Sequence, residues 1–125
     1  MKTPHILIVD DEPNIVMSLE FLMRKSHYQV SIARNGTEAL AAIAHTTFDL
    51  LLLDVMMPDV DGYQVCRQLR SQPAGTKTKV IFLSAKSKEA DIQEGYRAGA
   101  DKYIPKPFST RQLMEQVREL LGEIV

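Results

Sequence analysis

The sequence predicts a single α/β domain in which a parallel sheet is covered by helices on both faces. Short apolar runs alternate with longer segments of helical periodicity, five of each, along the whole chain. The most apolar of these runs show no alternation with polar residues, which is typical of parallel strands that are buried on both faces. The 125 residues suffice for one domain with its own core, and no internal linker or repeat divides them. We therefore expect one domain over residues 1–125.

The composition is that of an ordinary globular domain. Hydrophobic residues make up 45% of the chain and charged residues 25%, with a formal net charge of -1. Nothing here favours bulk electrostatic binding to nucleic acid or to acidic membranes. We find no signal peptide, and the apolar runs are far shorter than the ~20 residues that a membrane helix needs. The one cysteine, Cys66, cannot form a disulfide within the chain, so a cytoplasmic location is expected.

The first strand is predicted at His5–Val9, an apolar run that ends at Asp10. Pro13 suits the first turn of the next helix, because its missing N–H would be unpaired there in any case. The apolar side of that helix is predicted to consist of Ile15, Leu19, Leu22 and Met23.

The second strand, Gln29–Ala33, alternates polar and apolar residues, as expected of a strand with one wet face. The second helix is expected to turn Leu40, Ile43 and Ala44 inward. The third strand is a run of four leucines, Leu50–Leu53, which ends at Asp54.

Asp61 is predicted to cap the third helix, with Gln64 placed as in a capping box. The fourth strand is expected at Val80–Ser84, followed by a helix that Ser87 would cap. A short fifth strand at Lys102–Pro105 precedes a last helix. The predicted cap of that helix is Ser109.

Strand composition also predicts the order of the strands in the sheet. The runs at His5–Val9, Leu50–Leu53 and Val80–Ser84 are almost purely apolar, so they belong at the centre. Gln29–Ala33 carries polar residues and Lys102–Pro105 is short, so both belong at the edges. With right-handed crossovers, the favoured order in chain numbering is 2-1-3-4-5, as in flavodoxin-like folds.

Polar residues lie at the ends of four of these strands or directly after them. They are Asp10 and Asp11, Asp54, Ser84 and Lys106. Because the carboxyl ends of parallel strands share one edge of the sheet, we expect these side chains to meet at a crevice there.

Three neighbouring carboxylates repel one another, and a divalent cation relieves that repulsion. Oxygen ligands without cysteine or histidine favour Mg²⁺ over zinc or copper. Aspartate is ionised at neutral pH and can attack phosphorus without a general base. Asp54, at the tip of its strand, is the best-placed nucleophile. Asp10 and Asp11 are better placed to hold the metal, and Lys106 to neutralise a phosphoryl group.

The sequence resembles the receiver domain of two-component response regulators over nearly its whole length. The matching motifs are VDDEP, LLLLDVMMPDVDGYQVCRQLR, VIFLSA and GADKYIPKPF, in the order and at the spacing of that family. Each motif alone is weak, but the four together are very specific.

The resemblance implies a role for each matching position. Asp54 would accept a phosphoryl group from a sensor histidine kinase or phosphotransfer protein. Mg²⁺ would be held by Asp10, Asp11, Asp54 and the backbone carbonyl of Met56, and Lys106 would pair with the phosphoryl group.

The resemblance also implies a switch and a docking surface. Ser84 and Tyr103 would be the switch pair, and the Lys106–Pro107 peptide bond would be cis. Phosphorylation would change the surface of the fourth helix, fifth strand and fifth helix, which controls an output domain or a downstream protein. Such a domain promotes only its own phosphorylation and dephosphorylation, and it is a monomer or a phosphorylation-dependent dimer.

The main alternative is a Mg²⁺-dependent phosphohydrolase with an aspartyl-phosphate intermediate. Haloacid-dehalogenase-like enzymes normally carry a second aspartate two residues after the first, where this chain has Met56. A nucleotide- or flavin-binding module would need a glycine-rich loop after the first strand, where Asp-Asp-Glu-Pro stands instead. A receiver that has lost its chemistry would not be expected to keep Asp10, Asp11, Asp54 and Lys106.

Overall fold

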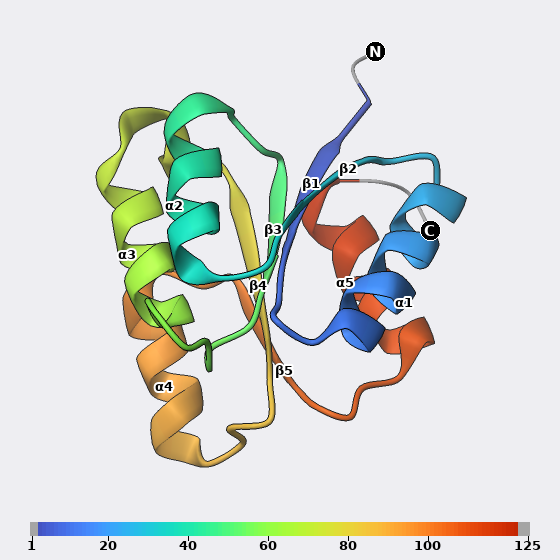
Figure 1. Ribbon diagram of the computed structural model, residues 1–125. Coiled ribbons are helices and arrows are strands. Elements are labelled where there is room, and N and C mark those ends of the chain that lie inside the picture. Colours follow the sequence, from blue (N-terminus) through green and yellow to red (C-terminus); the bar gives the residue numbers. More distant parts are fainter. Residues whose placement is uncertain (1–2, 123–125) are drawn as a thin grey trace.

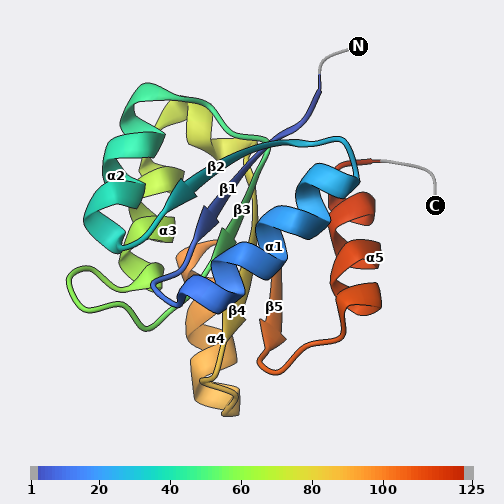
Figure 2. The same ribbon diagram turned by 45° about the vertical axis from the view of Figure 1, so that its right-hand side comes forward.

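The computed structural model describes residues 3–122, which form a central parallel sheet between two layers of helices (Figures 1 and 2). Strands and helices alternate along the chain, and one short 3-10 helix, η1, precedes the fourth strand. The elements are β1 His5–Val9, α1 Pro13–Lys25, β2 Gln29–Ala33, α2 Gly36–His45, β3 Leu50–Leu53, α3 Gly62–Ser71, η1 Pro73–Thr76, β4 Lys79–Ser84, α4 Glu89–Ala98, β5 Lys102–Pro105 and α5 Thr110–Leu120.

The sheet has the strand order β2-β1-β3-β4-β5, and all neighbouring strands are parallel. The predicted fold class and order are thereby confirmed. The almost purely apolar strands β1, β3 and β4 are central, because only side chains without polar groups suit a position covered on both faces.

The sheet divides the hydrophobic core into two clusters. Leu51, Leu53 and Phe82 face one cluster together with residues of α2, α3 and α4. Leu50, Leu52 and the residues of α1 and α5 form the other. Figures 1 and 2 show the same division, with α1 and α5 on one face of the sheet and the other three helices on the opposite face. Successive residues of a strand contribute to opposite clusters, as the two-residue period of a strand requires.

Side chains cap three of the helices. Asn35 accepts a hydrogen bond from the Glu38 N–H at the start of α2, and Ser109 accepts one from the Gln112 N–H at the start of α5. Asp61 caps α3 as predicted, through the Gln64 N–H at 2.9 Å. Each cap satisfies one of the N–H groups that a helix leaves unpaired at its first turn.

Two local expectations were wrong. Ala44 is exposed, and α2 instead buries Ala39 and Ile43, with Leu40 partly covered. Ser87 does not cap α4, because that helix begins one residue later than expected, with Lys88 in the N-cap position.

Arg70, in the last turn of α3, ties two connections together. Its guanidinium donates hydrogen bonds to the carbonyls of Gly75, Thr78 and Gly99. It also contacts the Asp101 carboxylate at 3.1 Å, and that carboxylate accepts a hydrogen bond from the first buried residue of β4, Val80, at 2.8 Å. Arg70 therefore fixes the segments before β4 and before β5 relative to α3.

The longest helix of residues 3–122, α1, has 13 residues, and none of the described helices meets the length and apolarity needed to cross a bilayer.

Candidate functional site

Asp10 and Asp54 lie side by side because β1 and β3 are neighbours and both end at the same edge of the sheet. The Asp54 N–H donates to the Val9 carbonyl at 2.9 Å, which continues the strand pairing by one residue. Asp11 follows at the start of the next connection. One carboxylate oxygen from each of these three residues lies within 4.8 Å of the others. The structure thus brings the three predicted carboxylates together.

The three carboxylates differ in their surroundings. Asp10 is 2% exposed, and its Oδ1 accepts a hydrogen bond from the Glu12 N–H at 2.9 Å. Asp54 is 5% exposed, whereas Asp11 is open to solvent. Two buried carboxylates beside an exposed one form a concentration of negative charge that needs a positive partner.

Lys106 supplies part of that positive charge. Its Nζ lies 2.9 Å from Asp10 Oδ2, 3.5 Å from Glu12 Oε1 and 3.7 Å from Asp54 Oδ1. The Lys106 N–H donates to the Ser84 carbonyl at 2.7 Å, and the Lys106–Pro107 peptide bond is cis. Burial alone would lower the pKa of Lys106, but the hydrogen bond to Asp10 and the nearby carboxylates outweigh it, so the pKa is raised and the ammonium stays charged.

The electrostatics of Asp54 are set mainly by burial. Burial and the charge of Asp10 raise its pKa from 3.8 to about 6, although Lys106 acts in the opposite direction. Asp54 is therefore ionised at neutral pH, but its charge is held in an unfavourable environment. A bound cation relieves such a charge.

Ser84 and Tyr103 both form hydrogen bonds with the backbone of Lys86. Ser84 is fully buried, and its hydroxyl accepts a hydrogen bond from the Lys86 N–H at 3.0 Å. The Tyr103 ring is buried, and its hydroxyl donates to the Lys86 carbonyl at 2.7 Å. The two residues therefore hold the two peptide groups that flank the Lys86 Cα, in the connection that follows β4.

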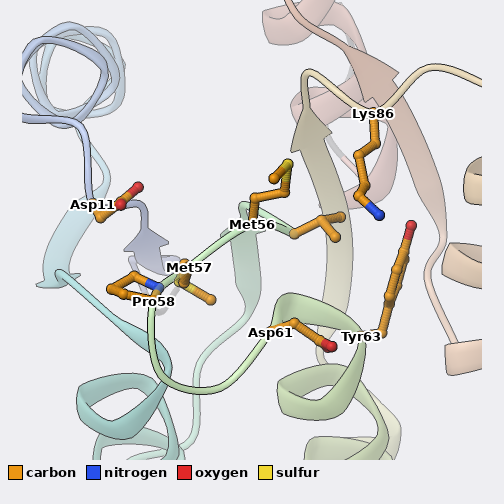
Figure 3. Close-up of a pocket in the computed structure, with 8 residues that line it drawn as sticks. Asp11, Met56, Met57, Pro58, Asp61, Tyr63 and Lys86 are labelled. Atoms are coloured by element: carbon orange, nitrogen blue, oxygen red, sulfur yellow. The ribbon is translucent and has the colours of Figure 1, made fainter.

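An open groove of about 510 Å³ adjoins the acidic cluster. Its lining residues are Asp11, Val55, Met56, Met57, Pro58, Asp61, Tyr63 and Lys86. Figure 3 shows Asp11 on one side of the groove and Tyr63 with Lys86 on the other, with Met56 between them. The Met56 side chain and Asp11 are both exposed, so the groove opens to solvent beside the acidic cluster.

Asp59 has a role that the sequence analysis did not identify. Its carboxylate accepts hydrogen bonds from the Gly36 and Thr37 N–H groups, at 3.0 and 2.8 Å, and so caps α2 from the loop after β3. The hydrogen bonds from Thr37 hold the pKa of Asp59 well below its usual range. A Cβ at Gly36 would lie only 2.3 Å from the Val60 carbonyl oxygen, so only glycine allows this close approach. The loop that carries Met56 is thereby docked on α2.

The chemistry of the donor set matches a small, hard divalent cation. All side-chain donors are carboxylate oxygens, and Lys106 already neutralises part of their charge. Such a set is typical of Mg²⁺, which binds through one or two carboxylates and retains several waters. A buried carboxylate beside a candidate cation site and an ammonium group is suited to phosphoryl transfer, which depends chiefly on alignment and charge neutralisation.

A model of the response regulator receiver domain matches residues 6–118. The chain belongs to this family. Receiver domains are phosphorylation-activated switches of two-component signalling and use Mg²⁺ at an acidic site, and the Asp10, Asp11 and Asp54 cluster could hold such an ion. The family implies a histidine kinase as partner and an output function downstream.

Similar proteins agree with this membership. The transcriptional regulatory protein ResD of Bacillus subtilis is 45% identical over 116 residues, which cover 93% of this chain and 47% of ResD. The chain therefore spans about half the length of this curated relative. A putative response regulator from Chloroflexus aurantiacus has a TM-score of 0.91 and 34% identity, with coverage of 98% of this chain and 100% of that one.

A second solved structure is the receiver domain of a sensor histidine kinase from Pseudomonas aeruginosa, which has a magnesium ion coordinated in its active-site cleft. It has a TM-score of 0.89 and 28% identity, and the match covers 98% of this chain and 100% of that one. None of the three proteins described here is named as a phosphohydrolase, so they give no support to that alternative.

Proposed function

We propose that Asp54 is the phosphoryl acceptor of this receiver domain, and that residues 1–125 form one such unit. The observation that carries the proposal is the position of its carboxylate beside Asp10, Asp11 and the Lys106 ammonium. Asp10 is already engaged by Lys106 and by the Glu12 N–H, and Asp11 is exposed. Asp54 immediately precedes four residues that line the groove, where a phosphodonor can approach it.

Mg²⁺ would be held by Asp10, Asp11 and Asp54 together with the backbone carbonyl of Met56. The magnesium ion in the similar Pseudomonas aeruginosa receiver supports this assignment. When bound, the ion supplies positive charge that neutralises the phosphoryl oxygens and the crowded carboxylates.

Transfer from a phosphohistidine of a sensor kinase or phosphotransfer protein needs no general base. A carboxylate oxygen of Asp54 attacks phosphorus as the phosphorus–nitrogen bond breaks, and the imidazole leaves with the bonding electron pair and takes a proton from solvent. Lys106 pairs its ammonium with a phosphoryl oxygen and so stabilises the charge that spreads over the phosphoryl group. Asp54, which takes up the phosphoryl group, thus lies beside the Lys106 ammonium, which stabilises the charge of that group.

The switch consists of Ser84 and Tyr103. The Ser84 hydroxyl turns to the new phosphoryl group and gives up the hydrogen bond from the Lys86 N–H. Because the Tyr103 hydroxyl bonds to the carbonyl of the same residue, a shift of Lys86 changes how the Tyr103 ring is held. The surface of α4, β5 and α5 changes in consequence and controls an output domain or a separate protein.

The domain acts as a signalling protein in the cytoplasm, as a monomer or a phosphorylation-dependent dimer, without direct contact to nucleic acid or membrane. It promotes only its own phosphorylation and dephosphorylation. Steady release of phosphate from phosphate esters would contradict this and favour the hydrolase.

Mass measurement of the intact chain tests the acceptor. Incubation with a small phosphodonor and Mg²⁺ is expected to add the mass of one phosphate, and Asp54→Asn to abolish the addition. Asp49→Asn is the matched control, because Asp49 is an exposed aspartate at the opposite end of β3. Phosphate on another residue, or the same addition to the Asp54 variant, would overturn the assignment.

A further inference from the structure

Three aromatic side chains form a row beneath α4. Tyr63 comes from α3, Phe82 from β4 and Tyr103 from β5, and we call these three residues the aromatic row. The Tyr63 and Phe82 ring centroids are 5.4 Å apart at an interplanar angle of 62°, and those of Phe82 and Tyr103 are 5.7 Å apart at 40°. A Cβ at Gly95 would lie 2.7 Å from the Tyr103 ring, so α4 packs closely on the row only because this residue is glycine.

The two outer members of the row bond to the same segment of backbone. The Tyr103 hydroxyl donates to the Lys86 carbonyl at 2.7 Å, and the Tyr63 hydroxyl donates to the Asp91 carbonyl at 3.0 Å. The Lys86 ammonium lies 3.8 Å from Asp91 Oδ1, which joins the two ends of the segment directly. The connection from β4 into α4 is thus fixed at both ends by a tyrosine hydroxyl.

α4 has few other strong attachments. Its buried residues are Gly95 and Ala98, which have almost no side chain to pack, and Ile92 is only partly buried. Its N-cap residue, Lys88, makes no capping hydrogen bond with its side chain to any described residue. An element with little buried apolar surface opens locally at a low free-energy cost. The Tyr63 hydrogen bond is therefore a large part of what holds the first turn of α4.

The Tyr63 hydroxyl keeps its proton and so remains a hydrogen-bond donor. Burial and the neighbouring Tyr103 hydroxyl raise the pKa of Tyr63 well above its usual range, so the hydroxyl remains protonated. Tyr63 also lines the groove beside the acidic cluster, opposite Asp11 (Figure 3). It therefore borders both the proposed site of phosphorylation and the helix that is expected to respond.

We propose that Tyr63 is a positioning residue of the switch, whose hydroxyl holds the first turn of α4 in place so that a shift of Lys86 is passed on to that helix. This inference rests on the proposed roles of Ser84 and Tyr103. Without the Tyr63 hydrogen bond, the first turn of α4 loses an attachment to α3 whether or not Asp54 is phosphorylated, and the exposed Arg67–Glu94 ion pair at 3.3 Å remains between the two helices.

Hydrogen–deuterium exchange on the full chain, with and without a small phosphodonor and Mg²⁺, tests the inference. Tyr63→Phe removes only the hydroxyl, and Tyr96→Phe makes the same change at an exposed tyrosine on α4. Without phosphodonor, the amides of residues 89–95 are expected to exchange about fivefold faster in Tyr63→Phe, the effect of one lost hydrogen bond. The Tyr96 variant should match wild type. Over the same residues, the change caused by phosphorylation is expected to shrink in Tyr63→Phe.

Two outcomes would overturn the inference. In the first, Tyr63→Phe matches the Tyr96 variant both with and without phosphodonor. In the second, exchange rises evenly over all elements while the response of α4 to phosphorylation is unchanged, which would make Tyr63 merely structural. The intact mass of each sample distinguishes these outcomes from failure of the proposed function. If the proposed function fails, wild-type protein carries no phosphate on Asp54 after treatment with the phosphodonor. That result would also remove the switching role, while exchange without phosphodonor would still report on the Tyr63 contact.

Discussion

Replacing Asp54 by asparagine is expected to stabilise the metal-free protein at neutral pH, although Asp54 is its proposed functional residue. Asparagine has nearly the shape of a protonated aspartate but carries no charge. The substitution therefore removes a nearly buried negative charge that lies beside two other carboxylates. Lys106 remains paired with Asp10 at 2.9 Å, so its ammonium keeps a partner.

The pKa of Asp54 sets the size of the effect. Burial and the Asp10 charge raise this pKa from 3.8 to about 6. A group with a raised pKa in the folded state contributes stability that is fully present below its unfolded pKa and is lost as the pH rises through its folded pKa. At about 1.4 kcal/mol per pH unit, the difference between the two values corresponds to as much as about 3 kcal/mol. Asparagine retains this stability at every pH.

Urea unfolding followed by circular dichroism, in the presence of a chelator, measures the difference in the free energy of unfolding. The advantage of Asp54→Asn over wild type is expected to be about 3 kcal/mol at neutral pH and to fall below about 1 kcal/mol near pH 4. Asp49→Asn, at an exposed position, should show no such pH-dependent gain. An advantage that is absent at neutral pH, or that stays constant down to pH 4, would refute the reasoning.

Three other substitutions test further parts of the structure. Asp11→Ala is expected to weaken Mg²⁺ binding at least tenfold by calorimetric titration, since about 1.4 kcal/mol suffices for that factor; unchanged affinity would remove Asp11 from the site. Gly95→Ala should displace the Tyr103 ring, because the added Cβ would lie 2.7 Å from it, and unshifted ring signals in nuclear magnetic resonance spectra would contradict this. Arg70→Ala should lower the free energy of unfolding by about 2 kcal/mol in urea, because several carbonyls and the Asp101 carboxylate lose their donor; an unchanged midpoint would show that water replaces the guanidinium.

The features that follow from residue type and topology could be predicted from the sequence. Apolar content separated the central strands from the edges, which fixed the order of the sheet. Because parallel strands end at one edge of the sheet, the sequence alone predicts that Asp10, Asp11, Asp54 and Lys106 lie together, and the structure brings them together. Caps that act within three residues, such as Asp61, were also predictable.

Other features depend on contacts that sequence spacing does not encode. The second helix is rich in alanine, so its inner face could be shifted by one residue, and Ala44 was predicted where Ala39 is buried. Asp59 caps a helix 23 residues away, and Tyr63 bonds to a carbonyl 28 residues away. Neither partner can be identified until α2, α3 and α4 are placed beside one another on the same face of the sheet.

The division of the core by the sheet has a consequence for variation in this chain. Neighbouring residues such as Tyr103 and Ile104 belong to different clusters, separated by a hydrogen-bonded layer of backbone. Substitutions in the α1–α5 half do not touch the aromatic row, and free-energy changes at sites without shared partners add nearly independently. Substitutions in the core between the sheet, α1 and α5 can therefore accumulate with little effect on the packing of the aromatic row under α4.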